Sequence, residues 1–352
     1  MSTNQFINRL VAQYLQQLET PSLSIPDGPT LTNPTVQRAV YTRMFDESAT
    51  WPLPPVHYRA RVLKMILARI EESIVDPEED EISDDLTETY STLICTPKPS
   101  SIQQAQQLTY VTYTAPSPSP SPPLPHPDSD STSDSNNNNP RTIITSESRG
   151  LILASGTTGF RTWEAALHLG TYLSTPAGAA LVSGKRVLEL GAGTGFLSMF
   201  CAKYLRPESV LATDMEPALI DGMVDSAGRN ELGENFGAGI WEWGTELRRL
   251  GGGEDEEKPV FDLVVGADLI YDTDLIPLLI NTLDDLFTNY KVQEFIIAAT
   301  LRNEKTFNAF LVACQSAHFK TERLPFDSPA ESDQSGFFHS TRIPISTYRV
   351  YR

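Results

Sequence analysis

Apolar residues recur at helical spacing in two stretches of the first third of the chain. The first stretch is residues 6–18, behind a cap signal at Ser2, and the second is residues 58–74, behind a proline-rich entry at residues 51–55. Amphipathic helices of this kind bury one face against another element. We therefore expect a mainly helical region, to which residues 107–114 add a strand because their apolar and polar positions alternate.

The C-terminal part of the chain alternates short apolar runs with helical patterns. Such alternation predicts a parallel β-sheet covered by helices, which is a Rossmann-like α/β fold. The predicted strands are residues 186–190, 210–213, 261–267 and 295–300. The predicted helices are residues 162–173, 195–205, 217–232, 274–287 and 304–318. Two late runs, residues 323–326 and 343–351, are candidates for a terminal antiparallel pair.

A segment rich in Pro, Ser, Asp and Asn separates the two regions. It has almost nothing to bury, so we expect a disordered linker at residues 115–140. The predicted domains are then a helical domain at residues 1–114 and an α/β domain at residues 141–352. A chain of 352 residues is long enough for two domains that each bury a core. Substrate recognition is a hypothesis for the helical domain, which carries no chemical motif.

Composition narrows the range of partners. The net charge of −18 is weak evidence against a nucleic-acid partner and favours a basic protein, although acidity also serves solubility. Three scattered cysteines are typical of reduced thiols, and five histidines without a ligand cluster indicate that no metal is bound. The longest apolar runs fall far short of the ~20 residues that a membrane helix needs. No targeting signal is visible, so we expect a soluble cytoplasmic protein without a membrane partner.

The strongest chemical signal is a glycine-rich turn between a predicted strand and a predicted helix. Strand residues 187–190 run directly into the turn at residues 191–195. Glycines there let the backbone turn sharply and approach a nucleotide without a Cβ in the way, although such turns also occur as plain connectors. Phe196 stands where the dinucleotide pattern requires Gly or Ala, which lowers the case for NAD, and no Walker motif is present.

Acidic and aromatic residues follow the other predicted strands. Asp214, after the second strand, can accept hydrogen bonds from both ribose hydroxyls, or it is an ordinary helix cap. Trp243, after a predicted third strand, can pack on adenine, although a tryptophan there is more often a core residue. After the fourth strand, Asp268 and Tyr271 face the crevice in which such sheets bind ligands, and helix capping is again the alternative for Asp268.

Taken together, four segments resemble the seven-β-strand protein-lysine methyltransferases. They are residues 159–166 (GFRTWEAA), residues 187–195 (VLELGAGTG), residues 243–244 (WG) and residues 267–271 (ADLIY), in which the D-x-x-Y tetrad is the most specific part. Within that group the chain is similar to the elongation factor 2 lysine methyltransferases. That similarity rests on residues 157–159 leading to Trp163, on the strand end at residues 300–303, and on the N-terminal helical region with residues 51–61. It covers residues 156–352 well and residues 1–114 weakly.

The resemblance implies a sheet of seven strands with the last antiparallel, and S-adenosylmethionine as cofactor. It implies a protein substrate, translation elongation factor 2, that is methylated on a lysine. The cofactor residues carried over by motif are Trp163, Glu189, Gly191, Ala192, Gly193, Asp214, Trp243 and Ala267. Glu189 is expected to support the glycine turn from below, and Asp268 and Tyr271 are the expected catalytic residues. The low-complexity segments at residues 115–140 and 251–257 depart from the family pattern.

The chemistry that these residues must serve is attack of a neutral amine on the methyl group of a sulfonium. A lysine ammonium has a reference pKa of about 10.4, so the site must favour the deprotonated amine and aim its lone pair at the methyl carbon. Asp268 is expected to orient the amine or to help its proton leave.

Three other functions compete with this interpretation. A small-molecule methyltransferase shares the glycine turn and the acid but has no reason to carry the D-x-x-Y tetrad. A non-catalytic adaptor that binds a translation factor through its N-terminal helices has no reason to retain the cofactor residues. An NAD oxidoreductase is disfavoured by Phe196 and by the missing hydride-transfer acid.

Overall fold

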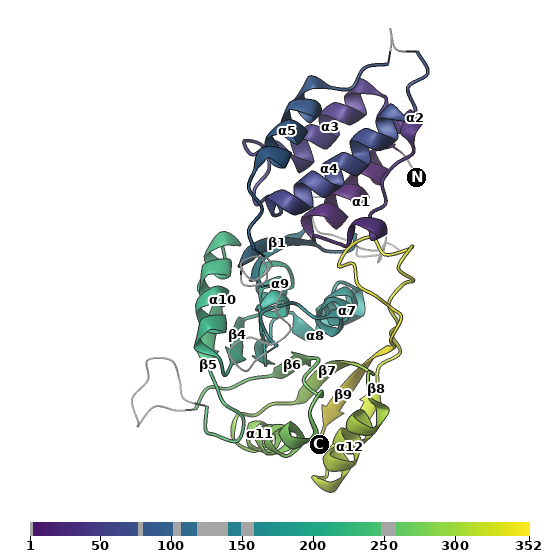
Figure 1. The fold of residues 1–352 in the computed structure, drawn as a ribbon. Helices are drawn as coiled ribbons and strands as arrows, with labels where there is room; N and C mark the ends of the chain where they lie inside the picture. The colour runs from purple at the N-terminus through teal and green to yellow at the C-terminus, as the bar shows by residue number, and fades with distance from the viewer. Residues whose placement is uncertain (1–2, 77–79, 101–106, 118–139, 149–157, 248–257) are drawn as a thin grey trace, which may run out of the picture.

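A computed structural model describes residues 3–76, 80–100, 107–117, 140–148, 158–247 and 258–352 (Figure 1). Most of the predicted linker and the predicted loop at residues 251–257 lie outside the described residues. The described residues form a helical bundle at one end, a two-stranded ribbon beneath it and a seven-stranded sheet covered by helices (Figure 1).

The N-terminal region is helical, as predicted. Its elements are α1 (Thr3–Leu15), the 3-10 turn η1 (Thr20–Ser22), α2 (Gly28–Leu31), α3 (Pro34–Met44), α4 (Val56–Glu71) and α5 (Asp84–Cys95). The apolar stripes of α1 and α4 meet in one core that includes Leu10, Leu63 and Ile66. The helices α2, α3 and α5 were not predicted. The side chains of Asp27 and Asn33 cap α2 and α3 and so help these two helices to start.

Strands β1 (Thr109–Thr114) and β2 (Thr142–Glu147) form an antiparallel ribbon, with Thr114 opposite Thr142 and Thr109 opposite Glu147. The predicted strand at residues 107–114 is therefore confirmed. Its partner comes from the other side of the predicted linker, so the ribbon belongs to both predicted domains. The domain division at residues 114 and 140 stays a prediction.

The main sheet has the strand order β5-β4-β3-β6-β7-β9-β8. Its strands are β3 (Arg186–Leu190), β4 (Ser209–Asp214), β5 (Phe236–Ile240), β6 (Leu263–Ala267), β7 (Glu294–Thr300), β8 (Lys320–Arg323) and β9 (Ile345–Tyr351). The pairs among β3 to β7 are parallel, and β9 is antiparallel to both β7 and β8. This is the predicted Rossmann-like arrangement, with seven strands and the last one antiparallel.

Helices cover both faces of the sheet. They are α7 (Glu164–Leu173), α8 (Pro176–Val182), α9 (Phe196–Tyr204), α10 (Pro217–Arg229), η2 (Thr273–Leu275), α11 (Ile276–Asn289) and α12 (Glu304–Ser316). Alternate strand residues enter opposite cores: Val187 packs with α7 and α9, whereas Leu188 packs with α11 and α12. Such continuous apolar strands are typical of a sheet buried on both faces. Among the described residues, no helix combines the length and apolar character of a membrane span.

The predicted strand at residues 323–326 was wrong in position, because β8 ends at Arg323. The chain leaves the sheet there, since the Phe326 ring packs on the rings of His168 and Tyr172, with centroids 5.1 and 5.2 Å away. After one more hydrogen bond to β9, from the Leu324 amide to the Thr347 carbonyl at 2.9 Å, aromatic contact with α7 replaces strand pairing.

Candidate active site

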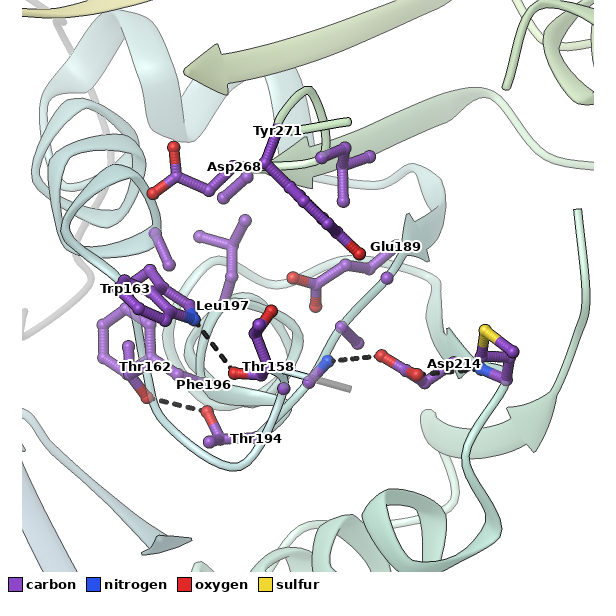
Figure 2. Close-up of a pocket in the computed structure, with 18 of the residues that line it drawn as sticks. Thr158, Thr162, Trp163, Glu189, Thr194, Phe196, Leu197, Asp214, Asp268 and Tyr271 are labelled. Carbon is purple, nitrogen blue, oxygen red and sulfur yellow. Dashed lines mark hydrogen bonds between the residues drawn. The ribbon is translucent and has the colours of Figure 1, made fainter. Parts of the chain in front are cut away.

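A cavity of 390 Å³ opens at the carboxyl ends of β3, β4 and β6 (Figure 2). All ten residues that the sequence singled out line it: Trp163, Glu189, Gly191, Ala192, Gly193, Asp214, Trp243, Ala267, Asp268 and Tyr271. The volume lies within the range of about 300–1,000 Å³ that is usual for small-molecule sites. Among the described residues, no group of His, Cys, Asp and Glu side chains is arranged to hold a metal ion.

The glycine turn has a backbone that only glycine adopts readily. Gly191, Gly193 and Gly195 have φ angles of +59°, +55° and +73°. A Cβ atom on Gly193 would lie 2.9 Å from the carbonyl oxygen of Gly159, and one on Gly191 would lie 2.7 Å from a methyl group of Leu269. The turn is therefore pressed closely between two other walls of the cavity.

Asp214 ties this turn to β4. Its Oδ2 accepts a hydrogen bond from the Gly193 amide at 2.9 Å, and its Oδ1 accepts one from the Met215 amide at 2.8 Å (Figure 2). Burial raises the pKa of the Asp214 carboxyl, while these backbone hydrogen bonds oppose the rise. Glu216, not Asp214, is the N-cap of α10, because its carboxylate accepts from the Ala218 amide. The capping alternative for Asp214 was therefore wrong.

Glu189 lies under the cavity, almost fully buried in the centre of the sheet. Its carboxylate accepts hydrogen bonds from both the backbone amide, at 2.9 Å, and the hydroxyl of Ser198. Burial raises the pKa of Glu189 to about 8, the Ser198 hydrogen bonds lower it, and the nearby Asp214 charge adds to the rise. Glu189 thus holds the first turn of α9, the helix that the glycine turn starts.

Asp268 joins the ends of two neighbouring strands. Its φ of +53° is unusual for a residue with a side chain, although Asp is among those that tolerate it. Its Oδ1 accepts from the Thr300 amide at 2.8 Å, and its Oδ2 accepts from the Thr300 hydroxyl at 3.0 Å. The N-cap of the following 3-10 turn is Asp272, which accepts from the Asp274 amide at 2.9 Å. The capping alternative for Asp268 was therefore wrong as well.

Arg302 and Arg161 line the cavity but were not singled out from the sequence, although both lie within the quoted motif segments. The Arg302 guanidinium contacts Asp268 Oδ2 at 3.3 Å and Glu164 Oε2 at 3.0 Å. Both arginines lie over the Trp163 ring, each 5.1 Å from its centroid. The Trp163 indole Nε1 donates to the Thr158 carbonyl at 3.0 Å (Figure 2). The indole is thus fixed by charge, stacking and one hydrogen bond.

Two other aromatic residues that the sequence singled out, Tyr271 and Trp243, belong to different walls. Figure 2 shows Tyr271 projecting from the end of β6 into the cavity. Burial, together with the charges of Asp214 and Asp272, raises the pKa of its phenol. The Trp243 ring lies 3.6 Å from the place where a Cβ of Gly191 would stand, so it lies close to the glycine turn.

The chain is similar in sequence to known proteins. A family model described as lysine methyltransferase matches residues 152–316. The chain is 40% identical to a protein-lysine N-methyltransferase EFM3 of Chaetomium thermophilum, over 100% of this chain and 99% of that protein. It is 30% identical to an EEF1A lysine methyltransferase 3 of Mus musculus, over 46% of this chain and 64% of that one. It is 26% identical to a protein-lysine N-methyltransferase EEF2KMT of Homo sapiens, over 52% of this chain and 58% of that protein.

Proposed function

The chain belongs to the lysine methyltransferase family, and on that premise we propose that it methylates a lysine of translation elongation factor 2. Methyl transfer from S-adenosylmethionine to a protein lysine is the activity of the family. Two kinds of likeness support elongation factor 2 as the substrate: the sequence features at residues 157–159, 300–303 and 51–61, and the human relative named EEF2KMT. The mouse relative named for EEF1A makes elongation factor 1A the substrate to test against it.

The observation that carries the methyl-transfer part of the proposal is the convergence of all ten predicted residues on one cavity. The cavity fits the cofactor in three respects. Its volume suits a nucleoside-sized ligand, its glycine turn lets the backbone come close, and a carboxylate ends the second strand of the sheet, where a ribose diol is usually bound.

Each wall of the cavity has its own part in holding S-adenosylmethionine. Asp214 would accept the ribose hydroxyls with the acceptor capacity that its backbone hydrogen bonds leave. Trp243 would pack on the adenine ring. The turn of Gly191 and Gly193 would let the backbone approach the rest of the molecule. When bound, S-adenosylmethionine supplies an electrophilic methyl group on a sulfonium.

The end of β6 would orient the lysine amine. A carboxylate has about four acceptor sites, and Thr300 and Arg302 occupy three of those on Asp268. One site is left to accept an N–H of the amine, which directs the nitrogen lone pair away from Asp268. The Arg302 guanidinium compensates the Asp268 charge, so the site does not hold the lysine in its unreactive ammonium form. Tyr271 would lie on the side of the amine opposite Asp268.

The proposal is tested with the purified full chain, S-adenosylmethionine and three separate substrates: elongation factor 2, elongation factor 1A and a pool of small amines. Mass spectrometry of peptides should find a new methyl group on a lysine of elongation factor 2. Gly193→Val is the matched inactive control, because its branched side chain would meet Gly159 in a strained backbone. Methylation of elongation factor 1A alone, or of small amines alone, would refute the proposed substrate.

A further inference from the structure

Another buried carboxylate lies outside the cavity, in the ribbon beneath the helical bundle. Glu147, the last residue of β2, is fully buried. Its Oε1 accepts hydrogen bonds from three hydroxyls: Tyr113 and Thr145 at 2.8 Å each, and Thr162 at 2.7 Å. Burying a carboxyl group is costly unless it is well hydrogen-bonded, so the three hydroxyls on one oxygen offset the cost of burying Glu147.

Two hydroxyls connect this carboxylate to the glycine turn. The Thr162 hydroxyl donates its single proton to Glu147, so the Thr194 hydroxyl must donate to Thr162, at 2.7 Å (Figure 2). Thr194 stands between Gly193 and Gly195 in the turn. The chain of hydrogen bonds therefore runs from Thr194 through Thr162 to Glu147.

Thr162 belongs to residues 159–163, the segment that lies over this turn. Within that segment the Phe160 carbonyl accepts from the Ser148 amide at 2.8 Å, and Gly159 closely approaches Gly193. The next residue is Trp163, which lines the cavity. The Thr162 to Thr194 hydrogen bond thus joins two walls of the cavity, and Glu147 fixes that bond from behind.

We propose that Glu147 is a positioning residue for the S-adenosylmethionine site, acting through Thr162 and Thr194 to set the spacing between the glycine turn and the segment that carries Trp163. The residue does not touch the cofactor. Its role rests on membership of the family and on this geometry, and it is independent of which protein is methylated.

The test is the affinity of the full chain for S-adenosylmethionine, measured by isothermal titration, together with the melting temperature of each variant. Thr162→Val removes the link but keeps the shape, and it should weaken binding on the order of 10-fold, the scale of one buried hydrogen-bond pair left unmade. Thr162→Ser keeps the hydroxyl and should bind within about 2-fold of the parent.

Thr145→Val is the matched control. It removes a hydroxyl from the same Glu147 oxygen, at a buried position that does not line the cavity. It should lower the melting temperature much as Thr162→Val does, with little change in affinity. Glu147→Gln should weaken binding at least as much as Thr162→Val, and if that variant does not fold, the pair of threonine variants decides.

Equal affinities for Thr162→Val and Thr145→Val would overturn the proposal, because the network would then serve stability alone. Weak binding by Thr162→Ser would also overturn it, since the methyl group rather than the hydroxyl would then be responsible. Because no protein substrate enters these measurements, failure of elongation factor 2 as a substrate leaves their outcome unaffected.

Discussion

Asp214 ends the parallel strand β4, and Asp268 directly follows the parallel strand β6. Each carboxylate accepts a hydrogen bond from the backbone of another segment. Neither caps a helix, because Glu216 and Asp272 do so instead. A carboxylate held in this way keeps its orientation without a ligand, which is the preorganisation that binding and catalysis need. The roles given to the two residues stay proposals, and the role of Asp268 has a direct test.

Asp268→Asn should leave S-adenosylmethionine binding nearly unchanged and lower the rate of methyl transfer by roughly 10²- to 10⁴-fold, the usual effect of losing one positioned polar group. The physical reason is that the amide keeps one acceptor oxygen for the Thr300 amide, while its NH2 group replaces the second oxygen, so no carboxylate oxygen is left to accept from the lysine amine. Single-turnover rates and titration of the cofactor measure the two effects separately.

Asp272→Asn is the matched control for that variant. Asp272 lies four residues further on, is exposed and does not line the cavity, so its loss should change the rate only slightly. A rate for Asp268→Asn within a few-fold of the parent would rule out the proposed catalytic role.

Between β8 and β9, a long segment is anchored to the sheet and to α7 by a polar chain. Ser328 bridges two imidazoles, with 2.7 Å to His168 Nδ1 and 2.9 Å to His339 Nε2, and His168 Nε2 lies 3.1 Å from the Thr347 hydroxyl. Burial lowers the pKa of His168 to about 4, and the neighbouring His339 adds to the fall. Burial lowers the pKa of His339 as well. The anchor therefore requires neutral imidazoles.

The stability that this anchor provides should depend on pH. The pKa of His168 in the folded chain lies below its ordinary value of 6.5. Between these two values the unfolded chain therefore binds a proton at His168 that the folded chain does not bind. The contribution is fully present above about pH 6.5 and is lost as the pH falls toward 4. The melting temperature of the parent should drop across that range more steeply than that of His168→Gln.

His318→Gln, at an exposed position, is the matched control and should follow the parent curve. Parallel curves for the parent and His168→Gln would show that protonation of His168 does not control the anchor.

Within the described residues, side chains from both parts join the helical bundle to the α/β layers. Gln16, just after α1, exchanges two hydrogen bonds with the backbone of Phe338, in the segment between β8 and β9. Elsewhere the Arg229 side chain of α10 lies over the rings of Tyr110 and Trp51, 4.3 and 5.3 Å from their centroids. These contacts place the bundle beside the helix that follows Asp214, so the parts are packed together rather than only joined by chain.

Gln16→Ala should lower the free energy of unfolding by about 1–3 kcal/mol, because it leaves a buried amide and a buried carbonyl of Phe338 without partners. Denaturant unfolding measures it. Asn4→Ala, at an exposed position of α1, is the control and should be nearly neutral. Equal stability of the two variants would mean that the Gln16 contact contributes little.

The order of strand, glycine turn, helix, strand and acid was readable from the sequence, because each step depends on local pattern. Apolar runs define strands, φ angles above zero require glycine, and the carboxyl ends of parallel strands meet at one edge. Residues 186–190 are the strand that was predicted, and the ten candidate residues share one cavity. Local pattern did not locate α3 and α5, nor the four-residue helix α2, whose start depends on the Asp27 side-chain cap.

Only the tertiary structure revealed the partners of Arg302 and Glu147. Arg302 pairs with Glu164 across 138 positions of sequence, and Glu147 meets Thr162 and, through it, Thr194. Neither partnership has a local signature, because an arginine or a glutamate in a loop or at a strand end is usually solvated, and its sequence neighbours do not specify its partner. Packing of distant segments decides which charges are buried together, and burial makes an ordinary hydrogen bond strong enough to shape the site.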